Sequence, residues 1–199
     1  MPNLPTVWCI NKAPTAPPNN EEAIPHDRIM KNHTLQVLDI VPGTSVDGPG
    51  LRTSIYFAGC AHHCEGCHNP QSWDFSAGKT MSVDSIVEEV EKHGFNVTFT
   101  GGDPLYMPEA MTVLAKILKD RGYGIWCYTG FEFGQICRLP EYAELLHYID
   151  VMVDGPYVAS LRDTSLRFKG SSNQRLIDVA ASLQTENIVE WDDHMAEFL

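Results

Sequence analysis

Three cysteines that lie within eight residues are the first candidates for chemistry. They are Cys60, Cys64 and Cys67, in the pattern C-x3-C-x2-C, and thiolates at such close spacing are typical metal ligands. A structural zinc ion needs a fourth protein ligand, which one of three neighbouring histidines offers: His62, His63 or His68. An iron–sulfur cube normally takes four thiolates, so three leave one iron open to a small molecule. The spacing therefore predicts a metal centre, either closed zinc or an open iron–sulfur cluster.

A second motif, Gly101-Gly102-Asp103-Pro104, follows an apolar, β-branched segment. Glycines at a strand end let the backbone approach a ligand closely, because they carry no Cβ. Asp103 offers a carboxylate to a ligand ammonium group. The same four residues also suit an ordinary tight turn, so the motif alone leaves both interpretations open.

The elements that position these motifs alternate between strand and helix. Strands are expected at residues 35–41, 52–57, 96–100, 124–128 and 150–153, and helices at 82–92, 108–121, 132–138 and 141–148. This alternation predicts an α/β fold with a mostly parallel sheet. Parallel strands bring their carboxyl ends to one edge of the sheet. We therefore expect four loops to meet there: the cysteine loop, Gly101–Asp103, Thr129-Gly130 and Asp154-Gly155-Pro156.

Composition narrows the function classes. The chain has 199 residues, 43% of them hydrophobic, and a formal net charge of −12. A nucleic-acid binder or a protein docked on anionic lipid needs a basic surface, so neither partner is expected. No apolar run is long enough for a membrane span or a signal peptide, which predicts a cytoplasmic protein. In that reducing compartment, clustered cysteines indicate a metal site and not disulfides. Cys127 lies in an apolar strand and is expected to be a small buried hydrophobic residue.

Three regions differ in composition. Residues 1–33 hold six prolines and no glycine, which predicts a flexible arm; translation starting at Met30 would explain it. Residues 34–185 are expected to form the folded domain. Residues 186–199 form an acidic tail, expected to be solvated because no Lys or Arg follows Arg175.

With these motifs in order, the chain resembles radical S-adenosylmethionine (SAM) enzymes, which combine C-x3-C-x2-C with a glycine-rich strand end. Further segments narrow the resemblance to the activating proteins of anaerobic ribonucleoside-triphosphate reductase: residues 46–53, 66–73, 151–155 and 170–174. It extends from about Leu35 to Val179. Two details suit this subgroup, Asp instead of Glu at Asp103 and Gly66 where an aromatic residue is usual. Pro156 departs from related activases, which carry a SAM-binding lysine at that place.

The resemblance implies a [4Fe–4S] cluster on Cys60, Cys64 and Cys67, with SAM on the open iron. SAM cleavage would give a 5′-deoxyadenosyl radical that takes hydrogen from a glycine of the reductase, with an electron donor such as reduced flavodoxin. The residues implied in SAM binding are Gly66, Cys67, His68, Gly101, Gly102 and Asp103. No catalytic residue beyond the cluster is implied. The resemblance gives no role to Asp154 or to residues 170–175.

The implied fold is a partial, open (β/α) barrel, because about five to six βα units cannot close an eight-stranded barrel. Its open side would admit the glycine loop of the partner, with residues 46–50 at the docking rim. Two other functions stay open: activation of another glycyl-radical enzyme of the formate-lyase type, and a non-catalytic zinc-binding interaction module.

Overall fold

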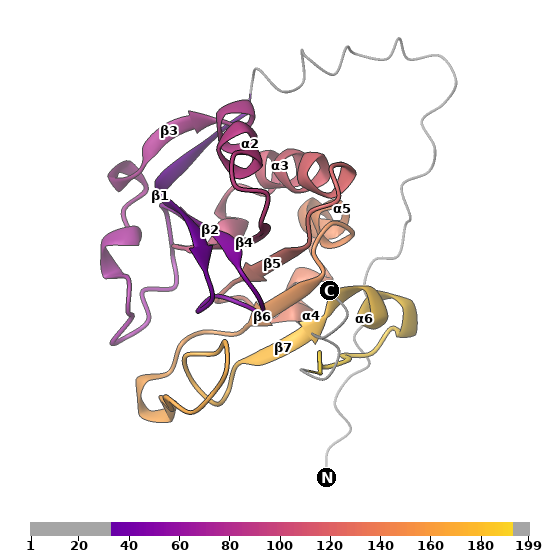
Figure 1. The fold of residues 1–199 in the computed structure, drawn as a ribbon. Helices are drawn as coiled ribbons and strands as arrows, with labels where there is room; N and C mark the ends of the chain where they lie inside the picture. The colour runs from indigo at the N-terminus through magenta and orange to yellow at the C-terminus, as the bar shows by residue number, and fades with distance from the viewer. Residues whose placement is uncertain (1–32, 193–199) are drawn as a thin grey trace.

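A seven-stranded sheet forms the centre of this computed structural model, which describes residues 33–192 (Figure 1). The strand order is β3-β1-β2-β4-β5-β6-β7. Four neighbouring strands run parallel: β2 (Arg52–Phe57), β4 (Asn96–Gly101), β5 (Ile125–Tyr128) and β6 (Val151–Asp154). The outer strands pair antiparallel with their neighbours: β1 (Thr34–Thr44), β3 (Lys79–Ser82) and β7 (Arg175–Asp178). The sheet is open, and the predicted α/β class with a mostly parallel sheet is confirmed.

Helices cover one face of this sheet. They are α2 (Val83–Glu91), α3 (Pro108–Asp120), α4 (Phe133–Ile136), α5 (Ala143–Leu146) and α6 (Val179–Thr185). Helix α3 packs against both α2 and α5, and Figure 1 shows the three side by side. Helix α2 begins where expected, because Ser82 accepts a hydrogen bond from the Ser85 N–H and so caps its first turn.

The core lies between these helices and the central strands. Ile55, Phe99 and Cys127 are neighbours in the registers of β2, β4 and β5, and all three are fully buried. The predicted buried position of Cys127 is therefore confirmed. Helices α2 and α3 each place their apolar side chains in the same core, among them Val87 and Leu114.

Two parallel strands are followed by long loops instead of helices. Strand β2 leads into the cysteine loop and two 3-10 turns, Pro70–Ser72 and Phe75–Ala77. Strand β6 leads into a loop that contains the 3-10 turn Ala159–Leu161 and ends at β7. The molecule thus places its longest irregular segments at the carboxyl ends of β2 and β6.

Within the acidic tail predicted at residues 186–199, Trp191 is buried instead of solvated. After helix α6, residues 187–191 return along β7, where the Trp191 N–H donates to the Leu176 carbonyl at 2.8 Å. The Trp191 ring is 9% exposed and packs edge-on against Trp126. The net charge of the tail did not predict this packing, because burial of one indole ring stabilises the segment while its acidic groups stay at the surface. The predicted arm, apart from His33, and residues 193–199 lie outside the described residues.

Within residues 33–192, no helix is long and apolar enough to span a lipid bilayer.

Candidate functional site

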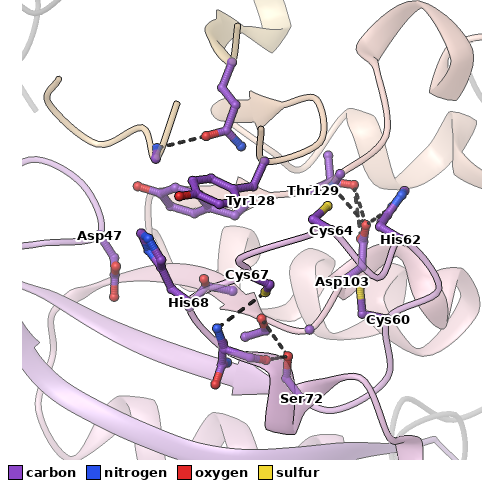
Figure 2. A pocket seen from close by; sticks show the side chains of 18 of the residues that line it. Asp47, Cys60, His62, Cys64, Cys67, His68, Ser72, Asp103, Tyr128 and Thr129 are labelled. Carbon is purple, nitrogen blue, oxygen red and sulfur yellow. Dashed lines mark hydrogen bonds and ion pairs between the residues drawn. The ribbon is translucent and has the colours of Figure 1, made fainter. Parts of the chain in front are cut away.

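A cavity of about 580 Å³ opens at the carboxyl ends of the parallel strands. Its wall contains at least one residue from each of the four loops that the topology was expected to bring together. Figure 2 shows side chains from three of these loops facing a common space, among them Cys64, Asp103 and Thr129. The residues that line it include Asp47, Cys60, His62, Cys64, Cys67, His68, Gly101, Gly102, Asp103, Tyr128, Thr129, Gly155, Tyr157, Lys169 and Gln174. The predicted convergence at one edge of the sheet is confirmed.

All three clustered cysteines line this cavity as free thiols, each partly buried. The backbone fixes their loop at both ends. The Gly59 N–H donates to the Ser72 carbonyl at 2.8 Å, and the Cys60 N–H donates to the Trp73 carbonyl at 3.2 Å. Within the loop the Asn69 N–H donates to Sγ of Cys67 at 3.4 Å. The thiols are therefore held on one wall by the surrounding chain.

Burial raises the pKa of the Cys60 thiol, and the nearby charge of Asp103 raises it further. Backbone hydrogen bonds from His62 and His63 act in the opposite direction and are smaller than the effect of burial. The metal-free thiol therefore stays protonated near neutral pH, and a metal group that binds there must displace the proton.

The neighbouring histidines are engaged elsewhere. Nε2 of His62 lies 2.7 Å from Oδ2 of Asp103, His63 stacks on Trp73, and His68 tilts against Tyr157. Among residues 33–192, no three His, Cys, Asp or Glu side chains are arranged to hold a single metal ion. The three histidines thus contact other side chains instead of completing a shell around the thiols.

Asp103 lies at the centre of the cavity wall, but its carboxylate is fully used inside the protein. It is 2% exposed and accepts hydrogen bonds from the Leu105 and Gly130 N–H groups and from the Thr129 hydroxyl, all at 3.0 to 3.1 Å, besides its contact with His62. Figure 2 shows Thr129 and His62 converging on it. These internal donors satisfy the carboxylate in this structure, and the contact of Asp103 with a ligand ammonium stays a prediction. Through these donors Asp103 joins the cysteine loop to the ends of β4 and β5.

Gly101 and Gly102 line the cavity as predicted, but the reason for glycine differs from the one expected. A Cβ on Gly101 would lie 2.5 Å from the Phe57 nitrogen, and a Cβ on Gly102 would lie 2.5 Å from the Gly59 carbonyl oxygen. Both glycines are thus required by the close approach of β4 to the end of β2 and the start of the cysteine loop. Their backbone still faces the cavity.

The structure separates the other predicted binding residues. Cys67 and His68 line the cavity, and His68 is solvent-exposed. Gly66 is not among the lining residues; it has a positive φ of 73°, and a Cβ there would meet Ala159 at 3.3 Å. Gly66 therefore shapes the turn that presents Cys67 and His68.

The segment 170–175 and Asp154 form one structural unit, which the sequence did not reveal. Arg175 donates through Nε and Nη2 to the two carboxylate oxygens of Asp154, which is 1% exposed. Oε1 of Gln174 accepts from the Gly170 N–H at 2.9 Å, and its Nε2 donates to the Gly155 carbonyl at 3.0 Å. These polar residues hold the loop after β6 against the start of β7.

Asp47, which belongs to the predicted docking rim, and Tyr128 also line the cavity, although neither was predicted to bind the ligand. Oδ2 of Asp47 accepts from the hydroxyls of Ser54 and Tyr56, both at 2.8 Å. Tyr128 faces the cavity, and its hydroxyl donates to the Phe168 carbonyl at 2.9 Å. Its place at the last position of a parallel strand was the available signal, since such positions face the site edge.

Comparison with known proteins agrees with this arrangement. Residues 46–177 match the family described as a 4Fe-4S single cluster domain. The curated anaerobic ribonucleoside-triphosphate reductase-activating protein of Enterobacteria phage T4 is 38% identical over 145 residues, 69% of this chain and 90% of that protein. Proteins with the same name from Haemophilus influenzae and Escherichia coli K12 are 30% and 31% identical, over 70% and 73% of this chain and 96% of each relative.

Among solved structures, QueE from Escherichia coli is a more distant likeness, with 14% identity and a TM-score of 0.49 over 67% of this chain and 75% of that one. The matches to the relatives at 30–38% identity extend over nearly the whole length of each relative. The residues that match the 4Fe-4S family include the three clustered cysteines. The chain therefore belongs to the family of anaerobic ribonucleoside-triphosphate reductase-activating proteins, with a 4Fe-4S single-cluster domain.

Proposed function

We propose that this protein generates the glycyl radical of an anaerobic ribonucleoside-triphosphate reductase by reductive cleavage of SAM. In this proposal Cys60, Cys64 and Cys67 hold a [4Fe–4S] cluster. The observation that carries it is the set of three free thiols on the wall of a 580 Å³ cavity, where the neighbouring histidines contact other side chains. A cube wrapped by three thiolates keeps one iron for a small molecule, whereas a structural zinc ion needs a closed shell.

The cofactors supply the chemistry of bond cleavage. When bound, the reduced cluster supplies one electron to the sulfonium C–S bond of SAM, and the products are methionine and a 5′-deoxyadenosyl radical that abstracts hydrogen from a glycine of the partner. The protein binds, orients and shields these groups. A homolytic reaction needs no acid–base pair, and none is proposed in this cavity.

The chain's own residues have three tasks in this scheme. The backbone of Gly101 and Gly102 and the turn Gly66–His68 form the surfaces against which SAM packs. Asp103 holds the cysteine loop against the β5 end, so that the thiols keep their places when the ligand enters and leaves. The open cavity mouth admits the glycine loop of the reductase, and reduced flavodoxin is the expected donor in the cytoplasm.

Anaerobic reconstitution with iron and sulfide tests the proposal. We expect about four irons per chain, a paramagnetic cluster after reduction, and SAM cleavage to 5′-deoxyadenosine. Cys64→Ala should abolish cleavage, while Cys127→Ala is the matched control because that thiol is fully buried in the core. Tightly bound zinc without iron in oxygen-free material would refute the proposal. Radical formation on a formate-lyase-type enzyme but not on the reductase would reassign the partner.

A further inference from the structure

Lys169 is the one lysine or arginine among the described residues that line the cavity. Its side chain is partly buried. No hydrogen bond or ion pair joins its ammonium group to any residue in the range 33–192. A cation without a partner on a cavity wall is available to a ligand that supplies an anion.

The backbone on both sides of Lys169 is fixed, so its position at the cavity is a built feature of the fold. On one side the Phe168 carbonyl accepts the Tyr128 hydroxyl at 2.9 Å, and the Phe168 ring packs edge-on against Trp126. On the other side the Gly170 N–H donates to Oε1 of Gln174 at 2.9 Å. Phe168 has a positive φ of 59°, a conformation that non-glycine residues adopt only when the surroundings enforce it.

Neither of the two carboxylates on the cavity wall, Asp47 and Asp103, pairs with the Lys169 ammonium group. Asp103 is occupied by four internal donors, and Asp47 accepts the hydroxyls of Ser54 and Tyr56. Neither forms an ion pair with Lys169. The cavity therefore presents one available positive charge and two carboxylates that are already hydrogen-bonded.

SAM carries a sulfonium, an ammonium group and a carboxylate, so the carboxylate is its only anionic group. We propose that Lys169 binds the carboxylate of SAM and thereby fixes the methionine end of the cofactor in the cavity. This inference rests on the proposed function and adds a binding residue to it.

Binding measurements on the reconstituted protein test this inference. The cluster is kept oxidised so that no cleavage occurs, and Kd is measured by calorimetry for SAM and for decarboxylated SAM, which keeps the sulfonium and the amino group. We expect Lys169→Met to raise the Kd of SAM about tenfold, the size of a charge-assisted hydrogen bond. The same variant should leave the Kd of decarboxylated SAM within about twofold, since that compound lacks the proposed partner.

Two variants complete the experiment. Lys169→Arg keeps the charge and should stay within about threefold of the parent protein for SAM. Lys92→Met removes an exposed lysine from the end of α2 and should change neither Kd. Iron content and the urea midpoint of each variant show whether it is folded and loaded; if Lys169→Met fails either check, the Arg variant and a Gln variant decide.

The outcomes separate this inference from the proposed function. If Lys169→Met weakens both compounds equally, or neither, while the parent protein binds and cleaves SAM, the role of Lys169 is refuted and the proposed function stands. If the parent protein holds no iron–sulfur cluster or does not bind SAM, both are refuted. A tenfold loss confined to SAM supports the assignment.

Discussion

The buried carboxylate of Asp103 gives the sharpest test of how this cavity is built. Its Oδ1 accepts the Leu105 N–H at 3.0 Å, and its Oδ2 accepts the Gly130 N–H at 3.0 Å and faces His62. Asp103→Asn replaces one oxygen by an NH₂ group of the same size. Whichever way the amide turns, one backbone N–H then faces a donor and loses its acceptor.

The expected cost follows from these contacts. An unsatisfied buried donor costs about 1–3 kcal/mol, and the remaining bonds also lose the charge that strengthened them. We therefore expect Asp103→Asn to lower the free energy of unfolding of the metal-free protein by about 2–4 kcal/mol. Urea unfolding under anaerobic, reducing conditions at pH 7 measures it, read from the midpoint at constant m-value.

Asp47→Asn is the matched control in the same cavity. Its donors are the hydroxyls of Ser54 and Tyr56, and hydroxyls can rotate to accept from an amide. This variant should lose less than about 1 kcal/mol. The reasoning is wrong if Asp103→Asn unfolds at the parent midpoint and loses only its affinity for SAM, because that pattern assigns the carboxylate to the ligand instead of to the wall.

Three further perturbations probe other parts of the fold. Arg175→Met leaves the buried Asp154 carboxylate without its partner and should lower the free energy of unfolding in urea by about 2–3 kcal/mol. The loss is below the about 3–5 kcal/mol of a fully buried pair because Arg175 is 32% exposed. Adding Asp154→Asn should restore part of the loss, and no restoration would contradict the pairing. Burial raises the pKa of Tyr128, so the folded state keeps the phenol proton above about pH 10, where the unfolded state loses it. The free energy of unfolding should therefore fall by up to about 1.4 kcal/mol per pH unit above about 10. Urea midpoints measured at about pH 8–11 should fall less steeply for Tyr128→Phe than for the parent protein. Gly48→Ala should lower the urea midpoint more than Gly50→Ala, because a Cβ on Gly48 would lie 2.7 Å from the Arg52 side chain whereas Gly50 faces open space. Equal midpoints would show that the loop shifts to accommodate the Cβ and would contradict this reasoning.

The central elements could be predicted because their local signals and tertiary roles agree. The helix after Ser82 has a cap, an apolar face and a terminal glycine, and the central parallel strands place apolar side chains such as Ile55, Phe99 and Cys127 in the core. Strand β3 has none of these signals. Lys79–Ser82 is short and polar, and it is a strand because it pairs with β1, from Thr34↔Ser82 to Val37↔Lys79. Such partners are far apart in the chain and leave no periodic pattern.

The candidate site divides in the same way. Topology was sufficient to predict that the cysteine loop and the glycine loop meet, because parallel strands align their ends. It could not predict that Asp103 is occupied, since His62 and Gly130 lie 41 and 27 residues away in the chain. The motif specified a carboxylate at the cavity, and only the distances show which donors reach it.

The hydrogen bonds of the cavity wall therefore separate support from recognition. Asp103 and Asp154 are almost fully buried and are satisfied within the protein, and each joins loops from different strands. The free thiols of the cysteine loop and the ammonium of Lys169 are only partly buried, and no ion pair engages them within the described chain. A site that must hold reactive groups in place requires its supporting bonds to be complete before the ligand arrives, so that binding energy goes to the ligand instead of to ordering the loops. Substitution of the supporting carboxylates should thus lower stability in the absence of any ligand, whereas substitution of the thiols or of Lys169 should leave the metal-free fold intact and remove only what it binds.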